Sequence, residues 1–594
     1  MSRSLRTRRE RPDIEINPLR ASPDPKDLGL PPLTYEQLLR NLSSLPFEAA
    51  MIHISALAAE VFHHSDDAEY QLRLASELYE DTQLLTRLRW FVESEPGMLV
   101  FDERYLTVLQ RLLVEHAAPS SSEEGLTGQQ VAILLTSLLA IPGIVTSRAP
   151  EDPLQTDVED DQLDDWTAFL VQGGAYYEKP DLGDAIARAH ALYCVLPQEA
   201  ALAAHIDACP LEEWSRCDYG VGLSEQLAAG FAAAIVSKAV DPNLGLKGRK
   251  LAIEPGWLGT GPLGEHEREL TAGFSATRDE LRDAFAEAGS NPEHVSWDRA
   301  PFEQRPFLRL DDGRLFLISP RVIFSWSTAG LYYRLLDSAN ARPRPDRPEK
   351  TLFTTFTRFV GALSEEYVVC ATREALSVNA PEGRANVYGD IEYWVEGQSK
   401  RSPDVAVDEG EDLILVEVFS GRLPRLARVL ADEQRIADAL GKAIIDKLDQ
   451  LSKATADVLA GDVPYPNLDI DSVKRVWPVL VLPGGGIVQL PVLWRYVERH
   501  LGETTFADER VAARTIATLD DYEPLLAIAE ERRVPLSSLL ADFHASAYRE
   551  LPPRNWVRVA HPREGPTRPR WVQNHYWAAA NDMKRQLGIE PTAE

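Results

Sequence analysis

Two acidic residues lie at the ends of neighbouring predicted strands in the C-terminal half of the chain. Asp404 precedes a short apolar strand, residues 405–407, and Glu417 stands near the exit of a buried apolar strand, residues 413–419. The polar segment 408–412 between these strands predicts an antiparallel hairpin. Such a hairpin brings the two carboxylates within reach of one metal ion, and hard oxygen ligands of this kind suit Mg²⁺ or Mn²⁺.

The residues around this pair resemble the core of the PD-(D/E)XK nuclease-like superfamily. Pro403-Asp404 matches the first half of that family's motif, and Glu417-Val418-Phe419 stands where the second half is expected. The order of predicted elements is also similar: a helix, strands, a helix and a strand. The resemblance covers residues 351–486. It implies an α/β restriction-endonuclease-like domain with a mixed central sheet, and metal-dependent hydrolysis of phosphodiester bonds, with DNA as the favoured substrate.

The family's motif has a lysine where this chain has Phe419. In these nucleases the lysine supplies positive charge where negative charge develops at the scissile phosphate. A helix predicted over residues 442–460 offers a replacement. Lys447 flanks the apolar stripe of this helix, whereas Lys442 and Lys453 point nearly the opposite way. We therefore predict that Lys447 takes the place of the missing lysine.

The resemblance also implies an additional acidic residue on the first core helix. That helix is predicted over residues 351–369, and Glu365 and Glu366 lie on its later turns. Either is a candidate accessory to the metal site, although the helical pattern by itself favours an exposed face for both. Glu392 is a weaker ligand candidate, on a strand predicted over residues 387–395 to pair with the Asp404 strand.

Basic residues in two places are candidates for nucleic-acid contact. Residues 549–585 hold eight Lys or Arg against three Asp or Glu, interleaved with tryptophans. Basic side chains follow phosphates and aromatic faces stack on bases. The alternative is a tail that packs its tryptophans onto the acidic body of the protein. The individual candidates are Arg554, Arg558, Trp571 and Trp577 in this segment, and Arg422, Arg425 and Arg428 after Gly421. Of these, Arg422 is also the second choice for the motif lysine, but its opposite strand parity then requires a bulge.

The composition limits the remaining classes of protein. A chain of 594 residues is expected to form several domains, and 44% hydrophobic with 26% charged residues is typical of globular proteins. The net charge of −30 suits a polyanion poorly, so nucleic-acid contact requires a local basic patch. Four cysteines, no apolar signal segment and no membrane-length apolar run predict a cytoplasmic protein without membrane contact.

The N-terminal half is predicted to be mainly helical and shows no pattern that indicates chemistry, because its histidines and cysteines lack the paired spacing of a metal site. Such a helical half suggests that it binds a protein partner. The whole-chain alternative to a nuclease is a protein that kept the fold, lost the lysine and acts as a nucleic-acid-binding or interaction scaffold.

The predicted order of units is a basic tail (1–31), a helical domain (32–148), an acidic linker (149–165), a helical region (166–300), a hairpin-plus-helix segment (301–340), a proline-rich linker (341–350), the nuclease-like domain (351–500), a helical appendage (501–548) and the basic aromatic segment (549–594).

Overall fold

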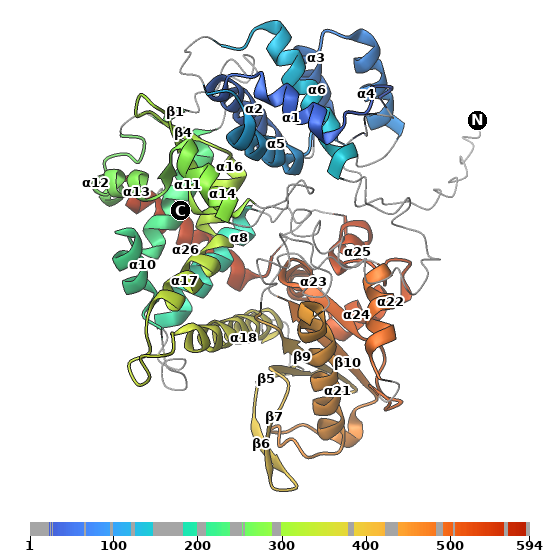
Figure 1. Cartoon of the computed structure of the whole chain (residues 1–594). Helices are drawn as coiled ribbons and strands as arrows, with labels where there is room; N and C mark the ends of the chain where they lie inside the picture. The colour runs from blue at the N-terminus through green and yellow to red at the C-terminus, as the bar shows by residue number, and fades with distance from the viewer. Residues whose placement is uncertain are drawn as a thin grey trace, which may run out of the picture.

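The chain folds into a helical N-terminal part, a middle region built around a small sheet, and a C-terminal α/β part (Figure 1). The predicted basic tail 1–31 and the acidic linker 149–165 fall largely or wholly outside the described residues. The computed structural model describes residues 23, 25, 28–64, 67–94, 99–119, 125–145, 182–198, 209–237, 252–253, 256–287, 299–377, 385–421, 438–482, 491–502, 505–562 and 568–589.

The N-terminal helices share one hydrophobic core, to which α2 and α5 contribute long apolar faces. The last helix, α6, continues through Pro142 to Val145, although the helical pattern of residues 128–139 followed by Pro142-Gly143 favours an end before this proline. Proline inside a helix costs about 3 kcal/mol, and burial of Leu139 and Ile141 beside it offsets that cost. The helices are α1 (Tyr35–Ser43), α2 (Phe47–His63), α3 (Ala68–Leu78), α4 (Thr82–Ser94), α5 (Glu103–His116) and α6 (Gly128–Val145).

The middle region contains the hairpin predicted after residue 301. Strands β3 (Phe307–Arg309) and β4 (Leu315–Leu317) pair antiparallel, as predicted, and β1 (Ala252–Ile253) and β2 (Ser275–Ala276) extend them to a four-stranded sheet. These outer strands are two residues long, too short to show an alternating pattern. The surrounding helical elements are α8 (Leu182–Ala189), η2 (His190–Val195), η3 (Leu196–Gln198), α10 (Leu211–Tyr219), α11 (Leu223–Val236), α12 (Pro262–Glu265), α13 (Glu267–Gly273), α14 (Arg278–Glu287), α15 (Ala300–Gln304), α16 (Pro320–Ser327) and α17 (Gly330–Ala341).

The proline-rich segment 341–350 is an exposed, irregular connection between α17 and the long helix α18 (Phe353–Ser377). The backbone N–H of Arg344 donates to the carbonyl of Lys350 at 2.7 Å and closes this loop. Helices α17 and α18 pack against each other and contribute to the same core.

The C-terminal part is organised by a five-stranded mixed sheet in the order β11-β10-β9-β8-β5. The predicted hairpin is confirmed, because β8 and β9 pair antiparallel. Strand β5 is antiparallel to β8, whereas β9, β10 and β11 run parallel. The strands are β5 (Asn386–Gly389), β8 (Val405–Asp408), β9 (Asp412–Val418), β10 (Arg475–Leu482) and β11 (Thr515–Thr518).

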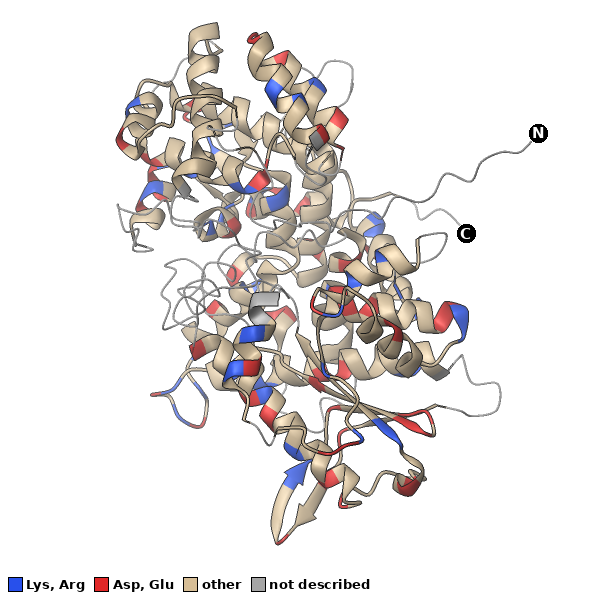
Figure 2. Ribbon diagram, turned by 90° about the vertical axis from the view of Figure 1, so that its right-hand side faces the viewer, with Lys and Arg blue, Asp and Glu red and all other residues tan. Residues whose placement is uncertain are grey.

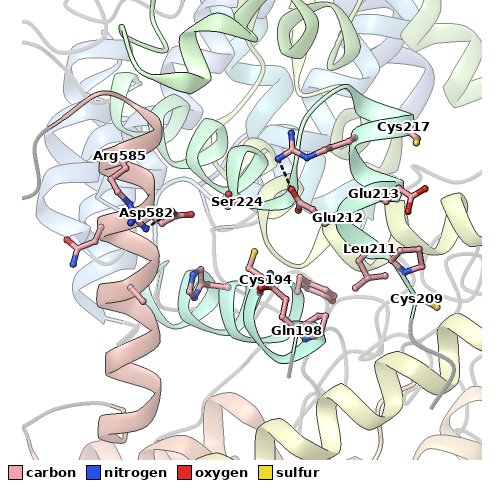
Figure 3. A pocket seen from close by; sticks show the side chains of 17 residues that line it. Cys194, Gln198, Cys209, Leu211, Glu212, Glu213, Cys217, Ser224, Asp582 and Arg585 are labelled. Carbon is pink, nitrogen blue, oxygen red and sulfur yellow. Dashed lines mark hydrogen bonds and ion pairs between the residues drawn. The ribbon is translucent and has the colours of Figure 1, made fainter. Parts of the chain in front are cut away.

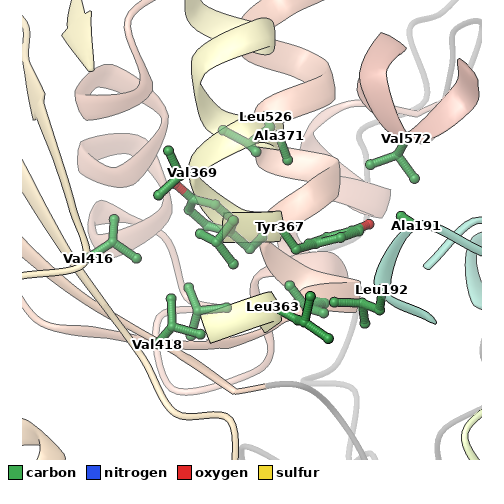
Figure 4. Close-up of a cluster of buried hydrophobic side chains, with 14 of the residues drawn as sticks. Ala191, Leu192, Leu363, Tyr367, Val369, Ala371, Val416, Val418, Leu526 and Val572 are labelled. Atoms are coloured by element: carbon green, nitrogen blue, oxygen red, sulfur yellow. The ribbon is translucent and has the colours of Figure 1, made fainter. Parts of the chain in front are cut away.

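Helices cover both faces of this sheet. On one face, Leu363 and Tyr367 of α18 pack towards Val416 and Val418 of β9 (Figure 4). On the other face, the alternate residue Leu415 packs with Leu451 of α21 (Asp446–Leu459), which follows the π-helical turn η5 (Gly441–Ile445). The two faces follow from strand alternation in a continuous apolar run.

Two further predicted elements differ from the structure. Residues 515–518, predicted as the start of a helix in the appendage, form the edge strand β11, and the helix α23 begins only at Leu519. The β-branched residues Thr515, Ile516 and Thr518 favour a strand. The strand predicted over residues 387–395 divides in two. Its first part is β5, and β6 (Glu392–Val395) leaves the sheet to pair with β7 (Gln398–Arg401) in a projecting hairpin (Figure 1).

The C-terminal helices return to the body of the protein. Helix α26 packs along α8, α11 and α18, so the end of the chain joins the middle region to the α/β part. Within the described residues, no single helix is long and apolar enough to cross a membrane, and only the α10–α11 pair, bent by 60°, meets the length and composition together. The remaining elements are η6 (Ile470–Ser472), α22 (Pro491–His500), α23 (Leu519–Arg532), α24 (Leu536–Ala545), α25 (Pro553–Ala560) and α26 (Arg570–Gln586).

Candidate active site

The register of the β8–β9 hairpin places Asp404 beside Glu417. Val405 pairs with Val416, and the same register continued by one residue sets Asp404 opposite Glu417. Directly opposed side chains of an antiparallel pair lie on one face, with Cβ atoms about 5 Å apart. Both side chains are buried, with exposed fractions of 8% for Asp404 and 2% for Glu417. The predicted pair of neighbouring carboxylates is therefore present at the exit of the central strand.

Two contacts fix this pair. The backbone N–H of Val418 donates to Asp404 Oδ2 at 2.7 Å, which holds the aspartate across the strand end. Lys447 Nζ donates to Glu417 Oε1 at 2.6 Å. The lysine comes from α21, whose Leu451 packs with Leu415 of β9, and this packing keeps the side of the helix that carries Lys447 close to the sheet.

The placement of the lysines on this helix agrees with the sequence prediction. Lys447 points towards the strand ends, whereas Lys453 is 74% exposed and pairs with Asp449. Lys442 is exposed. The helical periodicity thus identified the lysine that reaches the carboxylates, and its catalytic role stays a prediction.

Burial dominates the electrostatics of the pair. It raises the pKa of Asp404 well above its usual range, and the negative charges of Glu417 and Glu365 raise it further. Burial also raises the pKa of Glu417, although Lys447 and Arg401 act in the opposite direction. The cations that the protein supplies therefore do not offset the cost of keeping these carboxylates charged.

The structure separates the two candidate glutamates of α18. Burial raises the pKa of Glu365, which interacts electrostatically with Arg401, Lys447 and Glu417 and so faces the pair. Glu366 instead accepts a hydrogen bond from the thiol of Cys370 at 3.2 Å. One residue turns a helix by about 100°, so only one of two adjacent side chains faces the sheet end.

Helix α18 approaches the exit of β9 closely at a glycine. A Cβ atom at Gly361 would lie 3.2 Å from Ser420 Oγ and 3.9 Å from Glu365 Oε1. A larger residue would press on the Ser420 hydroxyl, so Gly361 lets α18 pass close to the chain that leaves β9.

An ion pair that the sequence did not identify borders the site. Arg401 Nε donates to Asp390 Oδ2 at 2.9 Å, and the two residues close the base of the β6–β7 hairpin. Their positions just outside an alternating segment, with a Glu-Gly turn between, are the sequence signal that could have suggested it. Glu392, the weaker ligand candidate, is exposed and hydrogen-bonded to Ser399, and the structure does not bring it to the carboxylates.

The donor chemistry of the pair fits a hard divalent cation. Mg²⁺ is usually bound through one or two carboxylates, with waters and substrate phosphates completing the octahedron. Asp404 and Glu417 supply such a set, with Glu365 facing them. No group of three or more His, Cys, Asp and Glu side chains that could hold a metal ion occurs among the described residues, so the carboxylates do not form an all-protein cage.

The structure places the nucleic-acid candidates in different environments. Arg422, Arg425 and Arg428 lie outside the described residues. Arg554 pairs with Asp520 at 3.8 Å and Asp521 at 3.6 Å. Trp571 packs on the core, with its ring centroid 5.1 Å from that of Tyr367. For these two residues the alternative of a tail packed on the body describes the structure.

Arg558 and Trp577 face outwards instead. Arg558 is exposed on α25, and Trp577 on α26 is 47% exposed. In the view of Figure 2, blue segments (Lys and Arg) and red segments (Asp and Glu) are interspersed along the described part of the ribbon. The exposed members of the segment are therefore the ones that a polyanion can reach.

A second candidate site lies in the middle region. A cavity of about 1150 Å³ is bounded by η2, α10 and α26, and the thiols of Cys194, Cys209 and Cys217 line it (Figure 3). Burial raises the pKa of the Cys194 thiol, which disfavours its thiolate form. Glu212 pairs with Arg216, and Asp582 pairs with Arg585. The charged groups on its wall are thus largely satisfied by one another.

Comparisons with known proteins return no relative of this chain: no family model matches it, and neither the curated proteins nor the solved structures contain a match.

Proposed function

We propose that this protein is a metal-dependent nuclease that hydrolyses phosphodiester bonds of DNA. The observation that carries the proposal is the ion pair between Lys447 and Glu417 beside Asp404, at the exit of the central strand. A partly buried amine next to two buried carboxylates is the group expected where a metal-bound phosphate gains negative charge.

Each residue of the site has a distinct role in this proposal. Asp404 and Glu417 would hold Mg²⁺ or Mn²⁺, and Glu365 on α18 would add negative charge near the ion without belonging to the ligand pair. The bound ion would supply Lewis acidity and a water of lowered pKa. The ammonium of Lys447 stabilises the charge that develops on the phosphate oxygens, and its bond to Glu417 holds it in place before substrate binds.

The test uses the full-length protein with labelled DNA and Mn²⁺. We expect cleavage by the wild type, and its loss in both Asp404→Asn and Glu417→Gln, because neutral amides bind a divalent cation weakly. Glu411→Gln is the matched control, because Glu411 is 66% exposed on the turn of the same hairpin. Cleavage that persists in both site variants, or in excess chelator, contradicts the proposal.

The degenerate scaffold is the second candidate, and Phe419 favours it. The N–H of Phe419 bonds to the carbonyl of Val481 at 2.9 Å, so the backbone continues beside β10 and leaves an apolar residue at the lysine's place. In that case the wild type binds DNA without cutting it. Phe419→Lys then restores weak cleavage, because residues 417 and 419 share one strand face.

A further inference from the structure

The β6–β7 hairpin is inserted between two strands that border the carboxylate pair. Strand β5 ends at Gly389, which pairs with Val405 at the start of β8. The chain leaves the sheet at Asp390 and returns at Arg401, three residues before Asp404. Both ends of the hairpin therefore join the sheet at the strand ends where the carboxylate pair lies.

One face of the hairpin is held against α21. Tyr393 and Lys400 lie opposite each other in the register. The Tyr393 hydroxyl donates to Asp457 Oδ2 at 2.7 Å, and Lys400 Nζ donates to the same atom at 2.8 Å. Tyr393 is 4% exposed. Since α21 also carries Lys447, one helix positions both the amine and the hairpin.

The opposite face carries an exposed tryptophan. Trp394 is opposite Ser399, and Glu392 is opposite Arg401, so strand alternation puts all four on the face away from α21. Trp394 is 69% exposed. It lies two residues, about 7 Å, along the strand from the Glu392–Arg401 pair. Arg401 pairs with Asp390 at the base of the hairpin, three residues before Asp404, so Trp394 lies on the same hairpin face as a residue at the border of the site.

The hairpin holds this tryptophan in a defined position. Its turn residues Glu396 and Gly397 have φ of 51° and 80°, the two positive values of a tight turn whose twist matches the strands. The Asp390–Arg401 pair closes the other end, and Ser402 Oγ accepts from the N–H of Ile391 at 2.8 Å. The exposed ring of Trp394 is therefore carried by a hydrogen-bonded hairpin rather than by an irregular loop.

We propose that Trp394 stacks on an unpaired base of the substrate a few nucleotides away from the phosphate that lies at Asp404 and Glu417, so that the protein acts on single-stranded or frayed DNA. This inference rests on the proposed nuclease function. A base in a duplex is covered on both faces by its neighbours. The exposed ring of Trp394 can therefore stack only on a base that is unpaired. Arg401 beside it supplies positive charge for the backbone.

The binding test uses the cleavage-deficient Asp404→Asn protein and an oligonucleotide with 2-aminopurine at successive positions. We expect fluorescence quenching at one position in single-stranded DNA, and little in the matched duplex. Trp394→Ala should remove the quenching and weaken single-strand binding about tenfold, while Trp394→Phe keeps part of both. Trp90→Ala is the matched control, because Trp90 is 64% exposed on α4.

The outcomes separate this inference from the proposed function. In the active protein, Trp394→Ala should raise KM with little change in kcat, and its thermal midpoint should match the wild type because the side chain is exposed. Position-specific quenching without any cleavage supports the stacking role and contradicts the nuclease proposal. Cleavage with equal KM in Trp394→Ala and wild type overturns the stacking role alone. Loss of a protein partner in Trp394→Ala, with DNA binding unchanged, also overturns it and assigns the ring to a protein interface.

Discussion

The amine of Lys447 lies 2.6 Å from Glu417 Oε1 although thirty residues separate the two in the chain. Lysine and glutamate come from different elements, α21 and β9, which pack through Leu451 and Leu415. Apolar packing between a helix and a strand therefore fixes the distance between two charges. The position that follows Glu417 on the same strand face is filled by Phe419.

We predict that Lys447→Ala removes cleavage while Mn²⁺ affinity changes little, because an ammonium stabilises developing charge without ligating the ion. Lys447→Arg should keep partial activity. Metal affinity is measured by titration calorimetry and cleavage by single-turnover kinetics. Lys442→Ala and Lys453→Ala, on the exposed side of the helix, should behave as wild type. An active enzyme that is indifferent to Lys447→Ala would disprove this role and direct attention to Arg422.

The adjacent glutamates of α18 provide a matched pair of substitutions. Glu365→Gln should lower cleavage about tenfold or more and weaken Mn²⁺ binding, because Glu365 faces the carboxylate pair. Glu366→Gln should leave both unchanged, because Glu366 accepts from Cys370 on its own helix. The measurement is the Mn²⁺ dependence of the cleavage rate. Equal effects of the two substitutions would show that α18 contributes only general negative charge.

Local patterns carried the sequence predictions that proved correct. The apolar run ending at Glu417 and the polar turn before it predicted the β8–β9 hairpin, and the apolar stripe of α21 predicted that Lys447 faces the sheet. Both depend on periodicity within a few residues. Long-range pairings could not be predicted in this way. The edge strand β11 is four residues long, and its place beside β10 is fixed by parallel pairing across a long connection. The Asp390–Arg401 pair depends likewise on the hairpin leaving the sheet, which a continuous run of strand-forming residues conceals.

The basic C-terminal segment should divide into binding and structural residues. Arg558→Ala should weaken single-stranded DNA binding and make the slope of log affinity against log salt concentration shallower by about 0.7, because one phosphate contact is lost. Trp577→Ala should weaken binding through lost base stacking. Both side chains are exposed. Arg554→Ala and Trp571→Ala should instead lower thermal stability, the latter by about 2 kcal/mol or more, because these side chains bind Asp520, Asp521 and the core. Fluorescence anisotropy at several salt concentrations and thermal unfolding distinguish the two effects. Unchanged DNA binding in both exposed variants would remove α25 and α26 from the interface.

A histidine outside the site gives a prediction for acid stability. His544 Nε2 lies 2.8 Å from Thr515 Oγ1 of the edge strand β11, and burial, with a smaller effect of Arg549, lowers its pKa to about 4. The histidine in the unfolded chain takes up a proton near pH 6.5, about its ordinary pKa, whereas the folded chain does not until about pH 4. Stability from this group is therefore complete above about pH 6.5 and is lost as the pH falls towards 4, by at most about 3 kcal/mol.

His544→Gln keeps a polar partner for Thr515 and cannot titrate in this range. We expect its thermal midpoint to lie close to or below that of the wild type at pH 7.5, and the wild type to lose more stability than the variant between pH 6.5 and 4.5. The other titrating groups are common to both proteins and cancel in the difference between them. The measurement is the thermal midpoint of the two proteins across this range in one buffer series. Parallel curves for the two proteins would show that the imidazole is protonated in the folded state, and that the packing of α24 on the sheet admits its charge.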